Sequence, residues 1–191
     1  PERGHDRHPV RSQIAVQSGL PNITKAIAQP EDMPRAEAWI AENVSQGGMR
    51  VRLPLGDRES LHIGCLLGIR PEGGENWLVG VVRRLSREDE NSAVAGIQTI
   101  SKHPLAVELG SEDRMQPGLL LDAPDEGEAV RLIVPAHSFR ADGTVECMVA
   151  GMQLSLSPVD LMERGMDFEL VRYRVTPTAV AFEDEAEKDS P

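Results

Sequence analysis

The side chains best suited to ligand chemistry lie in two short segments of the N-terminal quarter of the chain. The first segment, Arg7-His8-Pro9-Val10-Arg11, carries an arginine at each end. A guanidinium is a flat fork of donors that can pair with phosphate oxygens, read the O6 and N7 edge of guanine, or stack on a purine face. Arg7 and Arg11 are therefore candidate anion- and purine-binding residues.

The second segment reads Asn43-Val44-Ser45-Gln46-Gly47-Gly48. In an extended chain Asn43 and Ser45 point the same way, so an amide and a hydroxyl can read a guanine edge together. Gly47 and Gly48 allow positive φ and leave no side chain between the backbone and a flat base. Asn43, Ser45 and Gly48 are the candidate base-binding residues of this segment.

Each segment also has an ordinary structural interpretation. An arginine pair is commonly a solvated surface pair, and Asn, Ser and two glycines commonly form a turn before a strand. The order of the segments favours a ligand site, as does the strand-like alternation of Met49-Arg50-Val51-Arg52-Leu53 that follows them. Arg50 and Arg52 share one face of that strand, where they add positive potential near a bound phosphate or solubilise the surface.

Together, R-x-x-x-R followed by N-x-S-x-x-G resembles the ligand-binding signature of PilZ domains, which are bacterial receptors for cyclic di-GMP. Residues 66–69, 79–85 and 94–98 resemble the later strands of the PilZ barrel, so the resemblance covers about residues 3–101. The ligand contacts that it implies are Arg7, Arg11, Asn43, Ser45 and Gly48, with Asp6, His8, Gly47 and Arg50 as possible additional contacts.

Short β-strands are expected to position these residues. Residues 1–13 are polar and are expected to form a flexible arm that a ligand orders. Between the motifs, residues 18–34 are longer than the PilZ pattern usually has and contain three prolines, so at most a short helix over 22–28 is predicted. Alternating or β-branched segments predict a small antiparallel barrel with strands over 13–17, 36–43, 48–53, 62–70, 77–86 and 93–101.

The sequence beyond His103 keeps its β character. Strands are predicted over 105–109, 118–122, 129–135, 144–150, 152–157 and 168–175, with one helical turn over 158–164. The expected fold is thus all-β: a PilZ-like antiparallel barrel at 1–102, a second small β-barrel-like domain without a ligand motif at 103–177, and an acidic disordered tail at 178–191. The alternative is that the second region completes a single larger sandwich with the first.

Composition excludes several classes of partner. A formal net charge of -11 opposes binding to DNA, RNA or an anionic membrane, and 3% aromatic residues argue against a stacking groove for single-stranded nucleic acid. No apolar run approaches the roughly 20 residues of a membrane span, so no membrane insertion is expected.

The two cysteines show no disulfide spacing, which indicates a cytoplasmic protein. The chain opens on Pro1, and an upstream segment is expected.

Other chemistries find little support in the pattern. His62 and Cys65 would lie on opposite faces of a strand without a second pair of ligands, so no metal is expected. No nucleophile motif or phosphodiesterase-like carboxylate cluster occurs, so no catalytic residue or cofactor is predicted. Arg83 and Arg84 are adjacent in a predicted strand, so one of them is expected to face outward.

The sequence therefore predicts a receptor rather than an enzyme. Arg7 and Arg11 would clamp cyclic di-GMP from the arm, and the ligand would change how the arm packs on the second domain. That change would signal to an unidentified downstream protein or upstream domain. The alternative is a ligand-free adaptor that uses a PilZ-like barrel as a protein-interaction surface.

Overall fold

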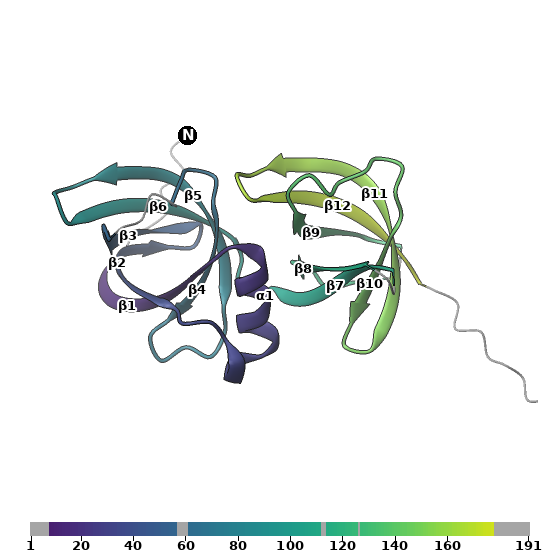
Figure 1. Ribbon diagram of the computed structural model, residues 1–191, viewed down its shortest axis with the longest axis horizontal. Coiled ribbons are helices and arrows are strands. Elements are labelled where there is room, and N and C mark those ends of the chain that lie inside the picture. Colours follow the sequence, from purple (N-terminus) through teal and green to yellow (C-terminus); the bar gives the residue numbers. More distant parts are fainter. Residues whose placement is uncertain (1–7, 57–60, 112–113, 126, 178–191) are drawn as a thin grey trace, which may run out of the picture.

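The computed structural model describes residues 8–56, 61–111, 114–125 and 127–177. Over these ranges the chain forms two closed antiparallel barrels of six strands each, one after the other along the sequence and side by side in space (Figure 1). The predicted all-β fold, a PilZ-like barrel followed by a second small barrel, is confirmed. A single larger sandwich does not form, because each barrel closes on its own strands.

The first barrel has the strand order β1-β2-β3-β6-β5-β4. Its strands are β1 (His8–Ser18), β2 (Glu37–Ser45), β3 (Gly48–Pro54), β4 (Leu66–Pro71), β5 (Leu78–Arg87) and β6 (Ser92–Ser101). Strand β1 closes the barrel, because its first part pairs with β2 and its last part with β4. Apolar residues alternate into the barrel centre around Trp39, Val51 and Ile69.

Two predictions at the edges of these strands are wrong. Residues 8–13, predicted as part of a flexible arm, instead belong to β1 and pair with β2. Residues 1–7 of the predicted arm lie outside the described residues. Strand β4 begins at Leu66 rather than at His62. The preceding residues form a turn in which the Cys65 N–H donates to the His62 carbonyl oxygen.

The stretch between the motifs folds as helix α1 (Leu20–Ala28) and a 3-10 turn, η1 (Pro30–Asp32). Pro21 is tolerated in the first helical turn, where its missing N–H has no partner to lose. The helix ends at Ala28 because Gln29 precedes Pro30 and is kept out of the helical conformation. In Figure 1, α1 lies between the two barrels.

The second barrel has the strand order β10-β11-β12-β9-β8-β7. Its strands are β7 (Leu105–Ser111), β8 (Arg114–Leu120), β9 (Ala129–Pro135), β10 (Val145–Val149), β11 (Met152–Arg164) and β12 (Phe168–Pro177). The helical turn predicted over 158–164 is wrong, since these residues extend β11 against β12. A register irregularity between Pro158 and Asp160 accommodates the proline, which has no N–H for the ladder.

A third apolar cluster joins the barrels. Leu20 and Ile23 of α1 pack with strand residues of the first barrel, including Val79, and with Phe168 and Leu170 of the second. Phe168 and Ile23 are fully buried in this cluster. The barrels therefore share a continuous apolar interface, with α1 wedged into it.

Hydrogen bonds donated by backbone N–H groups add to this interface. The Leu66 N–H donates to Asp167 Oδ1 at 3.0 Å, and the Met166 N–H donates to the Gly64 carbonyl oxygen at 2.9 Å. Burial raises the pKa of the Asp167 carboxyl. Within the described ranges, no helix combines the length and apolar character needed to span a bilayer.

Candidate ligand site

Strand pairing brings the two sequence motifs together. In the β1–β2 ladder, His8 lies opposite Val44 and Pro9 lies opposite Asn43. The register then shifts, so that Val10 and Arg11 together face the single residue Glu42. This bulge places the end of the R-x-x-x-R segment directly beside the start of the N-x-S-x-x-G segment, although helix α1 separates them in the sequence.

A pocket opens where strands β2 and β3 meet at their hairpin. Its volume of about 540 Å³ falls within the range of about 300–1,000 Å³ that is typical of small-molecule sites. The β2–β3 hairpin forms one wall, and β5 and β6 form the other. The lining residues are Asn43, Val44, Ser45, Gly47, Gly48, Met49, Arg50, Arg83, Arg84, Ser86, Val94, Gly96, Ile97 and Gln98.

Five of the nine predicted contact residues line this pocket, namely Asn43, Ser45, Gly47, Gly48 and Arg50. Arg11 is exposed on β1 and is not among the lining residues. Asp6 and Arg7 lie outside the described residues, as does the side chain of His8. The structure thus gathers the second motif around one cavity and places the backbone of the first motif next to it.

The hairpin holds its own polar groups in place. The Ser45 hydroxyl donates to the Gly48 carbonyl oxygen at 3.1 Å, and the Thr99 N–H donates to the Gly47 carbonyl oxygen at 3.1 Å. The Ser45 oxygen still has lone pairs that can accept a hydrogen bond from a ligand. The side chain is therefore oriented by its own turn before any ligand arrives.

The two glycines differ from what their sequence suggests. Neither Gly47 nor Gly48 adopts a positive φ, so the left-handed backbone that a glycine allows is not used here. A Cβ on Gly48 would overlap the Ile97 carbonyl oxygen of the neighbouring strand, whereas a Cβ on Gly47 would meet open space. Gly48 is thus required by the approach of β3 to β6, and Gly47 leaves space at the pocket wall.

Arg83 and Arg84 both line the pocket, which the sequence did not reveal. In the β5–β6 ladder, Val82 lies opposite Ile97 and Arg84 opposite Gly96, so Arg83 is an extra residue in a bulge. A bulge interrupts the strict alternation of side chains. Arg84 is exposed and Arg83 is half-buried, and the bulge lets both line the pocket.

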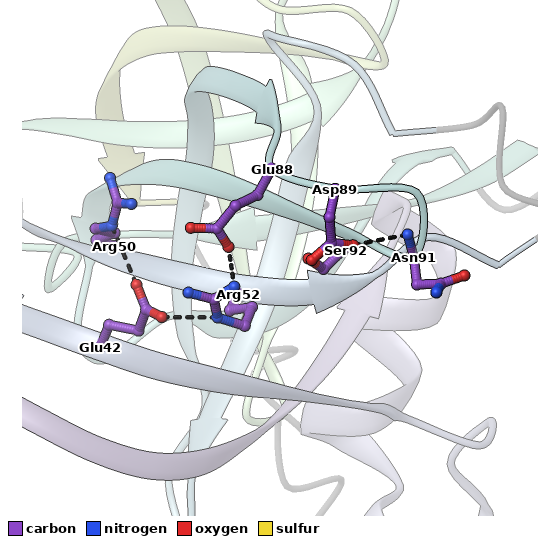
Figure 2. A network of polar contacts seen from close by, with 7 residues as sticks. All are labelled: Glu42, Arg50, Arg52, Glu88, Asp89, Asn91 and Ser92. Atoms are coloured by element: carbon purple, nitrogen blue, oxygen red, sulfur yellow. Dashed lines mark hydrogen bonds and ion pairs between the residues drawn. The ribbon is translucent and has the colours of Figure 1, made fainter.

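Carboxylates already engage some of the pocket's arginines. Glu42 accepts from Arg50 Nε at 3.1 Å and from Arg52 Nε at 2.8 Å, and Arg52 also pairs with Glu88 (Figure 2). The hydrogen bond from Arg50, followed by the one from Arg52, lowers the pKa of the Glu42 carboxyl. Arg50 therefore faces the pocket with its charge partly neutralised.

Figure 2 also shows the turn that joins β5 to β6. Asp89 accepts from the Asn91 N–H and from the Ser92 hydroxyl, each at 2.7 Å. The hydrogen bond from Ser92 is the main cause of the lowered pKa of Asp89. These bonds close the β5–β6 hairpin and thereby hold the strands that carry Arg83 and Arg84.

Arg83 is bound more completely than Arg50. Its Nε donates to Gln98 Oε1 at 2.8 Å, and its Nη2 donates to Glu163 Oε2 at 2.9 Å, with a second contact from Nη1 to the same carboxylate. Glu163 belongs to β11 of the second barrel. The hydrogen bond from Glu163 raises the pKa of Arg83 and lowers that of Glu163. Among the residues that the structure describes, Arg84 has no ion-pair partner.

A second cavity, of about 480 Å³, lies at the other ends of β2 and β3. Its walls are largely apolar and include Trp39, Leu53 and Leu85, with Asp167 at one side. Neither sequence motif contributes to it. In the described part of the chain, no group of three or more His, Cys, Asp or Glu residues is arranged to hold a metal ion.

Comparison with known families matches residues 2–105 to a family described as "Cyclic-di-GMP receptor FimW, middle PilZ domain". A search of curated proteins finds no match. The matched residues make up more than half of the 191-residue chain and include both motifs and the whole first barrel. The chain belongs to this family of PilZ domains.

Proposed function

We propose that this protein is a cyclic di-GMP receptor whose ligand occupies the pocket at the β2–β3 hairpin. The observation that carries this proposal is the β1–β2 register, which places Pro9 opposite Asn43 and so brings the backbone of the first motif beside the second motif, whose residues line the cavity. In this proposal the first motif adds the guanidinium groups of Arg7 and Arg11 to the amide, the hydroxyl and the glycines of the second.

The chemistry of the pocket suits a purine nucleotide with two phosphodiesters. A dianionic ligand approaching a protein with a net charge of -11 needs local positive charge, and Arg50, Arg83 and Arg84 line the cavity. Asn43 and Ser45 supply donors and acceptors for a guanine edge. We assign Arg7 and Arg11 to clamping the phosphates and bases from β1 and the residues before it.

We assign this protein the role of a receptor and effector rather than that of an enzyme. On binding, the ligand changes the packing of the N-terminal segment and the arrangement of the barrels, and a downstream protein or upstream domain responds. The pocket adjoins the inter-barrel contact at Arg83, which supports this coupling. We place the receptor in the cytoplasm, consistent with the buried thiols Cys65 and Cys147.

Titration calorimetry tests the proposal directly. We expect the wild type to bind cyclic di-GMP and to bind GMP and cyclic di-AMP much more weakly. Replacing Arg11 or Asn43 with alanine should weaken binding about tenfold to a hundredfold, since each removes a charge-assisted or buried hydrogen bond of about 1.5–3 kcal/mol.

Arg114→Ala serves as the matched control, because Arg114 is an exposed arginine of the second barrel. It should leave the affinity unchanged. No detectable binding of cyclic di-GMP by the wild type at high micromolar concentration would refute the receptor role. If the wild type bound no cyclic di-GMP and the Arg11→Ala variant still bound its partner protein, the protein would instead be a ligand-free adaptor.

A further inference from the structure

The pocket shares one of its arginines with the second barrel. Arg83 lines the cavity from the bulge in β5, and its guanidinium meets Glu163 of β11. Among the described residues, this is the ion pair that crosses from one barrel to the other; the remaining pairs stay within a barrel or join α1 to η1. The candidate ligand site is therefore connected to the second barrel through one side chain.

The hydrogen bonds of Arg83 leave no free edge for a phosphate. A guanidinium grips a phosphate bidentately through either the Nη1–Nη2 edge or the Nε–Nη2 edge. Glu163 occupies the first edge through Nη1 and Nη2, and Gln98 engages Nε and so blocks the second. An incoming phosphodiester can bind the Nη1–Nη2 edge of Arg83 in a bidentate manner only after the Glu163 carboxylate withdraws.

The Arg83–Glu163 pair is weak enough to be exchanged. The side chains are 36% and 27% exposed, so water screens their attraction, and a partly exposed ion pair contributes little to stability. A phosphate forms the same forked contact and also gains Arg84 beside it, which has no ion-pair partner in the described part of the chain. Withdrawal of Glu163 also removes a negative charge from the rim of the site.

Glu163 lies at the start of residues 163–168 of the second barrel, a segment that contacts the first barrel. The Met166 N–H bonds to Gly64, Asp167 accepts from the Leu66 N–H, and Phe168 fills the shared apolar cluster. A shift of Glu163 away from Arg83 is thus transmitted into the inter-barrel contact within a few residues. The same segment gives the ligand a route to the arrangement of the two barrels.

From these contacts we infer that Arg83 is a ligand-binding residue whose guanidinium is occupied by Glu163 until the ligand binds. The ligand's phosphate then displaces Glu163 and loosens the contact between the two barrels. This inference rests on the proposed cyclic di-GMP receptor function. Because coupling between two equilibria is reciprocal, the Arg83–Glu163 contact weakens ligand binding by the same factor by which bound ligand weakens the contact.

The first test is Glu163→Gln, which keeps the shape of the side chain and removes its charge. Calorimetry at low ionic strength should show cyclic di-GMP binding about threefold to fivefold more tightly than in the wild type, the size expected for release of one partly exposed ion pair. The matched control is Asp160→Asn, which removes a carboxylate of the same strand that pairs with Arg172 inside the second barrel. The control should change the affinity by less than about 1.5-fold.

A double-mutant comparison shows whether the effect passes through Arg83. Arg83→Ala alone should weaken binding, and adding Glu163→Gln to it should bring no further gain. An equal gain from Glu163→Gln with and without Arg83 would overturn the inference, because the effect would then be general charge repulsion. Unchanged affinity in Glu163→Gln, with the wild type binding normally, would overturn this inference alone and leave the receptor function standing.

The second test measures the barrels themselves. Spin labels are placed at Glu72→Cys, in an exposed turn of the first barrel, and at Met152→Cys, at the exposed start of β11 in the second, so their separation reports the inter-barrel arrangement. Saturating cyclic di-GMP should shift or broaden the distance distribution, and ligand-free Glu163→Gln should show part of the same change. An identical distribution with and without bound ligand would contradict the loosening, while absence of binding by any variant would remove the receptor function and this inference together.

Discussion

At the scale of single residues, some glycines and polar groups of the β2–β3 hairpin stabilise the fold, and others are available to a ligand. Gly48 faces the backbone of β6, and Gly47 faces open space. Ser45 is oriented by its own turn, while Asn43 lies in the register that joins the motifs. Adjacent positions of one motif therefore have different physical roles.

Gly48→Ala should destabilise the fold, because its Cβ overlaps the Ile97 carbonyl oxygen and a strand backbone has to move. We expect a loss of about 1–3 kcal/mol in the free energy of unfolding, measured by urea denaturation. The matched control is Gly47→Ala, which has room for the methyl group and a backbone that alanine accepts, so it should be neutral or slightly stabilising. Equal stabilities for the two variants would show that the β3–β6 approach does not require glycine.

The buried thiols give a second prediction at this scale. Burial raises the pKa of Cys147 to about 11 and also raises that of Cys65. Only about one Cys147 in a thousand is then a thiolate at pH 8, and the thiolate is the reactive form. An aromatic disulfide reagent should therefore react with both thiols slowly in the native protein and promptly in urea. Rapid native reaction of Cys147 would contradict this prediction.

At the scale of elements, bulges decide which side chains reach the pocket. The bulge at Val10 and Arg11 in β1 sets the position of the first motif against β2, and the bulge at Arg83 in β5 brings two consecutive arginines to the same cavity. Helix α1 exists because apolar residues at helical spacing meet an apolar interface and because Pro30 ends it. The stretch that lengthens the gap between the motifs is thus the wedge between the barrels.

The ion pair that joins the ends of β8 and β9 is the element-scale contact best suited to a pH test. Asp122 accepts from the backbone N–H and from Nε and Nη2 of Arg131, and the side-chain bonds from Arg131 lower the pKa of Asp122. Asp122→Asn should cost about 1 kcal/mol at pH 7, a value kept small because both side chains are about one-third exposed.

The sign of the pH dependence follows from the lowered pKa. The contribution of Asp122 is fully present above its unfolded value of 3.8 and is lost as the pH falls through the lower, folded value. The difference in unfolding free energy between the wild type and Asp122→Asn should hold from pH 7 to about pH 5 and shrink below about pH 3.8. Asp125→Asn, an exposed neighbour, provides the control and should show no difference. A gap that widens in acid would contradict the assignment.

At the scale of the whole molecule, the shared apolar cluster makes the barrels depend on each other. Both tryptophans of the chain, Trp39 and Trp77, belong to the first barrel region, so tryptophan fluorescence reports unfolding there. Phe168 belongs to β12 of the second barrel and is buried in the cluster that also contains Ile23. Truncation of the Phe168 side chain should therefore shift the unfolding transition that the tryptophans of the first barrel report.

Phe168→Ala should lower the free energy of unfolding by about 3–5 kcal/mol and move the fluorescence transition to lower urea. Val159→Ala, an exposed position on β11, should shift it by less than about 0.5 kcal/mol. Circular dichroism should follow the same transition as fluorescence. A fluorescence midpoint that stays in place while circular dichroism shows a separate early transition would mean that the barrels unfold independently.

The amino-acid sequence by itself determined the β class, most strand positions, and the two groups of side chains with ligand chemistry, because these are written in local alternation and turn residues. It misjudged the start of β1 and the end of β11, where pairing with a neighbouring strand extends the element. Only the tertiary structure decided three features of the site: the pairing of Pro9 opposite Asn43, the bulge at Arg83 and the Arg83–Glu163 contact. Register, bulges and contacts between barrels depend on long-range closure, and no local pattern in the chain specifies them.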